Sequence, residues 1–294
     1  MGYPELETSA FLKARRAALD PAELGLPGAR ARRRVGGLRR EEVAQLAGMS
    51  VDYYTRIEQG RANAISDAIV DAIARALRLT PDEHTYLRNI TQRRRPRPAA
   101  GSRPPRPAAR PRVRPQIRQV LDALDATIPA FVYGPALDVL AWNRLGNRVS
   151  FDLDTLPEDR RNGALMFFLH PDAKALHPDW ETVARETVAT LRAEAGRTPE
   201  SPRLCEVVGE LRERSEYFCD LWEAQAVSER VNGTKRILNP LVGELVLTYE
   251  VFALPADPGL VLCTYTAEQG SRTAEALREL AAGEPVGAVP ATVA

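Results

Sequence analysis

Residues 40–59 carry a hydrophobic pattern that fits two short helices joined by a tight turn, and no other feature restricts the fold as strongly. Gly48 stands where the first helix has to end, and glycine tolerates the left-handed backbone of such an end. Ser50 follows as a good N-cap for the second helix. Ala44 and Ala47 are small where two helices must cross closely. The sequence therefore predicts a helix-turn-helix, whose second helix enters the major groove of DNA.

Further helical patterns surround this hairpin. A first helix is expected over residues 8–20 and a fourth over 66–78, each with an apolar stripe at helical spacing. Residues 80–83, Thr-Pro-Asp-Glu, are typical of a helix start and predict a fifth helix that runs through Ile90. We expect residues 1–92 to form one all-α domain of five helices.

Charge is divided unevenly along the chain. Residues 1–114 carry 23 Lys and Arg against 12 Asp and Glu, a net charge of +11, whereas residues 115–294 carry 17 against 27, a net charge of −10. This asymmetry predicts a polyanionic partner for the first part only. Residues 93–114 hold nine Arg, six Pro and no acid, which is typical of an extended linker. This linker is either a plain spacer or a spacer that also touches phosphate.

Cysteines and apolar runs bear on the cellular setting. Cys205, Cys219 and Cys263 form no C-x-x-C pair, so the sequence predicts neither a disulfide framework nor a zinc site. No signal peptide is recognisable, and no apolar run approaches the length needed to span a membrane. We expect a cytoplasmic protein without membrane attachment. The composition, rich in Ala, Arg and Pro, is typical of bacteria with GC-rich genomes.

From residue 115 the pattern changes to two strands, several helices and three further strands. The expected strands are residues 130–133, 137–142, 234–238, 244–254 and 259–266. The expected helices are residues 117–124, 143–149, 163–169, 179–195, 203–214, 216–225 and 271–282. This order predicts an α+β domain over residues 115–283, with an antiparallel sheet and helices on one face, followed by a tail over residues 284–294.

The run from Gly37 to Arg61, which includes Tyr-Tyr-Thr-Arg-Ile-Glu-Gln-Gly at residues 53–60, resembles the phage-repressor-like (Xre) helix-turn-helix family. A helix-turn-helix reads bases with the start and the outward side of its second helix, and neighbouring groups hold the phosphates. The expected base readers are Ser50, Val51, Asp52, Thr55 and Arg56, and the expected backbone contacts are Arg39, Arg40, Gln45 and Tyr53. Arg56 is either a bidentate reader of guanine or a phosphate contact.

The second half resembles the MmyB-like ligand-binding domain of bacterial transcription regulators. The resemblance rests on residues 137–143, 177–181, 243–245 and 263–267, and it extends over about residues 115–283. It implies a PAS-like fold and raises a fatty-acid-type ligand as one possibility. Family members often carry a His before the Pro that ends the third strand. Here that position is Asn239, so no role of the His is transferred.

Large aromatic side chains stand at alternating strand positions beside the pair Phe167-Phe168. They predict an apolar pocket between the sheet and its helices, suited to an acyl chain. The expected ligand-binding residues are Phe131, Tyr133, Phe168, Arg236 and Tyr249, with Arg236 and Tyr249 as candidates for the mouth of the pocket. Apart from such a ligand, no cofactor is expected.

The histidines do not predict catalysis. His170 and His177 are seven residues apart across two prolines, which favours loop or helix-cap roles over a metal site. A P-loop, a dinucleotide fingerprint and a nucleophile elbow are all missing from the sequence, so we expect no enzyme. The sequence predicts a homodimeric transcription regulator that binds double-stranded DNA and is controlled by a small apolar ligand. Two alternatives are a C-terminal domain that only mediates dimerisation and an enzyme fused to a helix-turn-helix.

Overall fold

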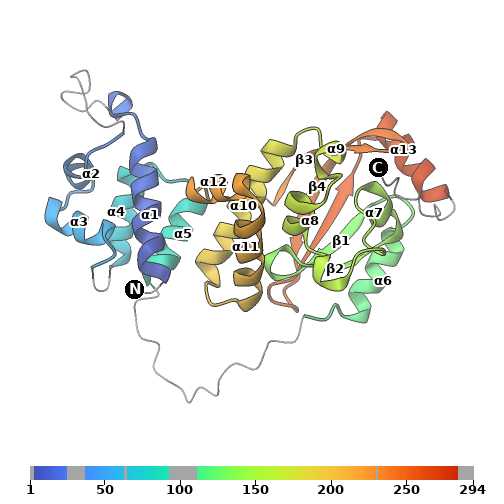
Figure 1. Ribbon diagram of the computed structural model, residues 1–294, viewed down its shortest axis with the longest axis horizontal. Helices are drawn as coiled ribbons and strands as arrows, with labels where there is room; N and C mark the ends of the chain where they lie inside the picture. The colour runs from blue at the N-terminus through green and yellow to red at the C-terminus, as the bar shows by residue number, and fades with distance from the viewer. Residues whose placement is uncertain (1–2, 25–36, 63–64, 93–110, 230, 284–294) are drawn as a thin grey trace, which may run out of the picture. The chain divides into compact units, whose positions relative to one another are not determined.

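The computed structural model describes residues 3–24, 37–62, 65–92, 111–229 and 231–283 (Figure 1). The chain forms two compact units. Unit 1 comprises Met1–Ala108, Arg185–Glu206 and Glu216–Glu229, and unit 2 comprises Ala109–Ala184, Val207–Ser215 and Arg230–Ala294. Two helices, α10 (Trp180–Arg197) and α11 (Pro202–Arg214), contribute residues to both units.

All five helices predicted for the N-terminal part are present in unit 1. They are α1 (Tyr3–Ala18), α2 (Arg40–Leu46), α3 (Val51–Glu58), α4 (Asp67–Ala76) and α5 (Pro81–Gln92). Helix α1 begins at Tyr3 rather than at residue 8, because Pro4 suits the first turn, where a backbone N–H has no partner in the helix. The prediction of an all-α helix-turn-helix domain is confirmed.

The core of unit 1 also uses residues from far along the sequence. Ala193 of α10 and Val227, which follows α12 (Glu216–Glu223), are buried in the same cluster as Phe11 and Tyr54. The contact is close, since a Cβ added at Gly196 would lie 2.3 Å from the Tyr86 ring. The domain boundary predicted at residue 92 thus does not coincide with the limit of this packed core.

A buried cation strengthens this packing. The Arg192 side chain is fully buried, and its guanidinium carbon lies 4.1 Å from the centroid of the Trp222 ring. Its Nη1 donates a hydrogen bond of 2.8 Å to Gln225 Oε1 and lies 3.7 Å from the carboxylate of Glu7 in α1. Glu7 also accepts a hydrogen bond of 2.5 Å from the Tyr86 hydroxyl. A buried guanidinium is tolerated only with such partners, so these contacts specify how the helices of unit 1 pack.

Unit 2 is built on a five-stranded antiparallel sheet in the order β2-β1-β5-β4-β3. The strands are β1 (Ala130–Tyr133), β2 (Val139–Trp142), β3 (Asn232–Asn239), β4 (Gly243–Ala253) and β5 (Val261–Thr266). The predicted α+β class and antiparallel sheet are confirmed. A short 3-10 turn, Pro135–Leu137, joins β1 to β2, and the register shifts between Val132 and Tyr133.

Helices cover the inner face of the sheet, and α6 also covers the outer face at β1 and β2, so the prediction of helices on one face is wrong in part. The inner face carries Phe131, Cys263 and Tyr265, which are buried in one cluster with Leu277 of α13 (Arg272–Ala282). The outer face carries Ala130, Val132 and Ala141, which are buried with Leu121 of α6 (Pro115–Leu124). Successive residues of β1 are apolar, and alternation places them on opposite faces, so both faces need cover. The remaining helices of unit 2 are α7 (Arg144–Val149), α8 (Gly163–Leu169) and α9 (Ala173–Leu176), which was not predicted (Figure 1).

Candidate functional site

The turn between α2 and α3 has the predicted helix-turn-helix geometry. Gly48 has φ of +66°, a left-handed backbone that glycine adopts at low cost. The N–H of Met49 donates to the carbonyl of Ala44 at 3.0 Å, which closes the end of α2. The Ser50 side chain accepts a hydrogen bond of 3.2 Å from the N–H of Tyr53 and caps α3. These local bonds set the direction in which α3 leaves the turn.

The inward side of α3 is held by a buried ion pair. Glu58 is fully buried, and its Oε2 and Oε1 accept hydrogen bonds from Arg16 Nε at 2.9 Å and Arg40 Nε at 2.8 Å. Burial alone would raise the pKa of Glu58, but the hydrogen bonds and charges of the two arginines lower it overall. Burial, and then the charge of Glu58, raise the pKa of the neighbouring Tyr54. Glu58 is therefore a structural acid that positions α3.

Most of the predicted DNA-contacting residues are solvent-exposed. Exposed side chains are those of Arg39, Gln45, Ser50, Val51, Asp52 and Arg56. Tyr53 and Thr55 are half-buried, and Arg40 keeps 40 % of its side chain exposed while its Nε binds Glu58. Arg40 is thus shared between a structural pair and any phosphate contact. The DNA contacts themselves stay predictions.

The inner face of the sheet brings together three of the five predicted ligand residues. The ring of Phe131 lies 6.1 Å from that of Tyr133, measured between centroids, and 5.7 Å from that of Tyr265. Tyr249 lies 6.0 Å from Tyr265, its direct register partner on β5. Burial raises the pKa of the Tyr133 and Tyr265 hydroxyls. Sequence reasoning missed Tyr265 as a ligand residue, although it lies two residues after Cys263 and shares its buried face of β5.

The other two predicted ligand residues lie elsewhere. Phe168 packs against Phe167 and against Trp180 at the start of α10, with centroids 6.1 and 5.9 Å apart. Arg236 is exposed, and its Nη2 lies 2.6 Å from Glu244 Oε1. The Arg236 guanidinium also lies 3.3 Å from Asp179. Arg236 thus belongs to an ion-pair cluster at the surface and not to the ring cluster of Phe131.

The cation that faces these rings is Lys235, which the sequence analysis did not single out. Lys235 pairs in register with the fully buried Leu247, and its Nζ lies 5.9 Å from the centroid of the Tyr265 ring. Burial raises the pKa of Cys263, while hydrogen bonding to Tyr265 and the charge of Lys235 act in the opposite direction. Alternation along β3 from the apolar Ile237 could have identified Lys235 as the inward residue.

His177 is the most perturbed histidine of unit 2. It directly follows α9, is 4 % exposed and lies between the rings of Phe151 and Phe167, with centroids 5.7 and 5.0 Å away. Neither of its ring nitrogens has a hydrogen-bond partner among the described residues. Burial, and then the charge of Lys235, lower the pKa of His177 to about 3. The described ranges contain no group of three or more His, Cys, Asp or Glu that could hold a metal ion.

Asn239, which replaces the histidine common in the resembled family, has a structural role. Its side-chain amide donates a hydrogen bond of 2.7 Å to the carbonyl of Arg148 in α7. Its Oδ1 accepts a hydrogen bond of 3.0 Å from the N–H of Leu241 and so closes the turn between β3 and β4. The side chain is 5 % exposed. Asn239 therefore ties α7 to the sheet.

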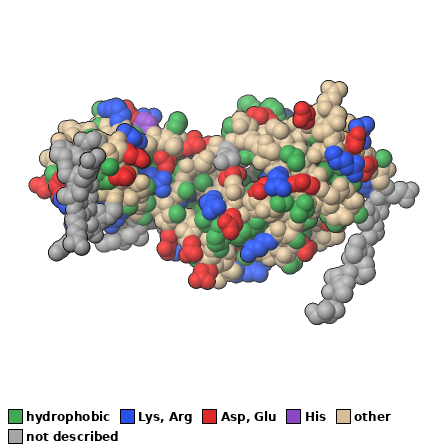
Figure 2. All heavy atoms as spheres, turned by 90° about the horizontal axis from the view of Figure 1, so that it is seen from above, with side chains coloured by type: hydrophobic (Ala, Val, Ile, Leu, Met, Phe, Trp, Pro, Cys, Tyr) green, Lys and Arg blue, Asp and Glu red, His purple; other side chains and the backbone are tan. Residues whose placement is uncertain are grey.

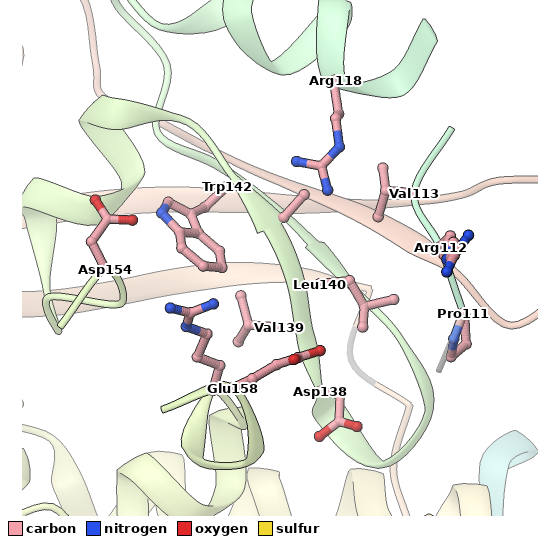
Figure 3. Close-up of a pocket in the computed structure, with 12 residues that line it drawn as sticks. Pro111, Arg112, Val113, Arg118, Asp138, Val139, Leu140, Trp142, Asp154 and Glu158 are labelled. Carbon is pink, nitrogen blue, oxygen red and sulfur yellow. The ribbon is translucent and has the colours of Figure 1, made fainter. Parts of the chain in front are cut away.

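A groove of about 750 Å³ opens at the edge of β2 (Figure 3). Its lining residues are Pro111, Arg112, Val113, Arg118, Asp138, Val139, Leu140, Ala141, Trp142, Asp154, Glu158 and Arg161. All of them belong to unit 2. None of the five predicted ligand residues is among them.

The face drawn in Figure 2 shows basic and acidic side chains interspersed, not gathered by sign.

A capped recognition helix with an exposed outward side, held by a buried core, defines a DNA-binding protein of the helix-turn-helix class. Residues 9–87 match a helix-turn-helix domain, and residues 113–280 match the MmyB-like transcription regulator ligand binding domain. The second match covers more than half of the 294 residues. The chain belongs to the family of MmyB-like transcription regulators, and it is a DNA-binding transcription regulator. A comparison with curated proteins found no match. Within the described residues, no helix combines the length and apolar character needed to cross a membrane.

Proposed function

We propose that this regulator is controlled by a small apolar acid, such as a fatty acid, bound on the inner face of the sheet in unit 2. The observation that carries the proposal is the row of Phe131, Tyr133, Tyr265 and Tyr249 beside the ammonium of Lys235. Aromatic rings supply apolar contact area, and a lysine supplies a point charge for a carboxylate. The rings touch one another, so a ligand has to separate them as it enters.

Ring separation would connect binding to a change of conformation. A ligand shifts an equilibrium only by its difference in affinity for the two states. An acyl chain that inserts between the rings binds the opened arrangement and not the closed one, which is the required difference. Both matched families are regulatory, and this favours a sensor over an enzyme.

The test is thermal unfolding of the full chain with and without laurate below its micellar concentration. Laurate should raise Tm, since a ligand at about 100 times its Kd stabilises the folded state by roughly 2.7 kcal/mol. Lys235→Met should reduce that rise, because the carboxylate loses its counter-charge. Lys13→Met, at an exposed position of α1, is the matched control and should leave the rise in Tm unchanged. No rise with the wild-type chain would contradict the proposal.

A second role of the domain, holding two copies together, is favoured by exposed apolar residues on β3 and β4. Leu238, Val246 and Phe252 are 43, 46 and 51 % exposed, and they supply apolar area that a second copy could bury. A single helix-turn-helix covers too little DNA for high specificity, so a homodimer on two half-sites fits the class. We propose that the regulator acts as a homodimer.

A further inference from the structure

The groove of about 750 Å³ lies at the β2 edge of the sheet, and two of its lining residues, Val139 and Trp142, are the register partners of Tyr133 and Phe131 on β1. Strand β2 ends the sheet, and on its outer side the N–H of Val139 donates a hydrogen bond of 2.8 Å to the carbonyl of Arg161. Beyond Val139, no described strand pairs with this side of β2. Ala141 pairs with Val132, and the N–H of Asn143 donates to the carbonyl of Ala130 at 3.0 Å. Backbone groups alternate in direction along an antiparallel strand, so those of Trp142 point away from β1 and into the open edge.

Cationic side chains stand on one side of this groove. Arg112 and Arg118 are exposed, and neither forms an ion pair with any described residue. Both come from the segment that leads into and forms α6. A guanidinium binds a carboxylate through two parallel hydrogen bonds, and an arginine without a protein partner retains that capacity. This side of the groove is suited to an anion.

Acidic side chains stand on the opposite side. Asp138 is 5 % exposed, and its Oδ1 accepts a hydrogen bond of 2.8 Å from Asn162 Nδ2, which holds the carboxylate in place. Glu158 is exposed at the start of the 3-10 turn Glu158–Arg160. Figure 3 shows Arg118 at one end of the view and Asp138 at the other, with Trp142, Val139 and Leu140 between them. This second side is suited to a hydrogen-bond donor.

The surface between these two ends carries the apolar side chains of Val139, Leu140 and Trp142. The guanidinium carbon of Arg161 lies 5.1 Å from the centroid of the Trp142 ring, and its Nε donates a hydrogen bond of 2.9 Å to the carbonyl of Leu153. Arg161 is therefore held over one face of the Trp142 ring, and its guanidinium is a second planar group next to the indole. Planar groups of this kind favour contact with an aromatic ring.

We propose that this groove is a second ligand site, which takes a small aromatic carboxylate bearing a hydroxyl at its far end. The carboxylate pairs with Arg118 and Arg112, the ring lies against Trp142 and Leu140, and the hydroxyl donates to Asp138 or Glu158. The volume lies within the usual range for small-molecule sites, about 300–1,000 Å³. The ligand differs from the apolar acid of the inner face because both of its ends are polar.

The test uses three probes in calorimetric titrations of the full chain. 4-Hydroxyphenylacetate should bind, and phenylacetate, which lacks the hydroxyl, should bind at least tenfold more weakly. 2-(4-Hydroxyphenyl)ethanol, which lacks the carboxylate, should also bind at least tenfold more weakly. Equal affinity for all three compounds, or no binding of the first, would overturn the proposal.

Variants then locate the binding. Arg118→Gln should lower the affinity for 4-hydroxyphenylacetate at least tenfold. Glu158→Gln should lower the affinity for 4-hydroxyphenylacetate and leave the affinity for phenylacetate unchanged. Arg278→Gln, on an exposed position of α13, is the control and should have no effect. Lys235→Met separates this site from the inner face, since it should change laurate binding only. Unchanged binding in Arg118→Gln, or loss of binding in Lys235→Met, would show that the groove is not the site.

Discussion

The Nε of Arg40 donates a hydrogen bond of 2.8 Å to the buried Oε1 of Glu58 and so ties α2 to the recognition helix α3. Arg16 of α1 occupies the other carboxylate oxygen at 2.9 Å. One buried acid thus joins three helices. The angle at which α3 reaches DNA depends on this acid as well as on the turn at Gly48.

Replacing Glu58 should weaken the helical unit. Glu58→Gln removes the charge that two arginines share, and breaking a buried ion pair of this kind costs about 3 kcal/mol. The lowered pKa of Glu58 means that this stabilisation is present above its unfolded pKa and is lost as pH falls through the lowered folded value. Urea unfolding at neutral pH measures the change. Arg40→Met should cost less, because Arg16 still pairs with the acid, and equal stability of Glu58→Gln and wild type would contradict the structural role.

Arg56 should contribute to sequence recognition. After selection of a binding site from random DNA, Arg56→Ala should lower affinity for the selected site more than for random duplex. A bidentate guanine contact is worth about 1–3 kcal/mol of discrimination. Fluorescence anisotropy titrations at several salt concentrations measure both affinities, with Arg278→Ala as the control. Equal losses on both DNAs, together with a reduced salt slope, would mean that Arg56 contacts phosphate only.

His177 should make unit 2 sensitive to acid. Its pKa is about 3 in the folded chain and about 6.5 when unfolded, so only the unfolded state takes up the proton between these values. The contribution of His177 to the free energy of unfolding is fully present above about pH 6.5. It falls as pH drops, by roughly 2–3 kcal/mol between pH 6.5 and 4.5. Urea unfolding across this range should show a smaller fall in His177→Phe, which keeps a ring between Phe151 and Phe167. Identical pH profiles would rule out this account of His177.

Two glycines in neighbouring helices offer a matched pair. A Cβ at Gly196 would lie 2.3 Å from the Tyr86 ring, whereas a Cβ at Gly209 of α11 would meet no atom within 4 Å. Gly196→Ala should therefore destabilise by about 1–3 kcal/mol through overpacking. Gly209→Ala should be stabilising by about 0.5–1 kcal/mol, because alanine favours a helix. Thermal unfolding measures both, and a neutral Gly196→Ala would mean that α10 does not pack on α5 in solution.

Dimerisation should depend on the exposed apolar side chains of β4, Val246 and Phe252. Light scattering coupled to size exclusion should show a dimer of the 32.4 kDa chain. Footprinting should show a roughly palindromic site with half-sites about one helical turn apart. Val246→Glu should shift the chain toward monomer, while Val120→Glu, equally exposed on α6, should leave the dimer intact. A monomeric wild-type chain that protects a single half-site would contradict the dimer.

The helix-turn-helix could be predicted because its signals are local. Gly48 and Ser50 act through backbone angles and hydrogen bonds within a few residues, so they specify the turn before any tertiary contact forms. The strands followed from alternation, which is also local. The antiparallel sheet followed from the order of these elements along the chain.

The set of chain segments that form the core of unit 1 could not be predicted in the same way. Ala193 and Val227 complete a core whose other members lie far earlier in the sequence. Arg192 looks in the sequence like a solvated helix residue, yet it is fully buried against Trp222. Such contacts depend on which helices meet, and the periodicity within one helix does not contain that information.

The predicted ligand-binding residues divide in the same manner. Phe131, Tyr133 and Tyr249 lie on one face of the sheet, as alternation predicts. On β3 the sequence analysis chose Arg236, whereas the structure places Lys235 on that face, as alternation from Ile237 would have indicated. The sequence by itself determined which segments become helices and strands, because those choices depend on neighbouring residues. Only the tertiary structure decided which faces are buried and which charges meet, because burial depends on contacts between distant segments.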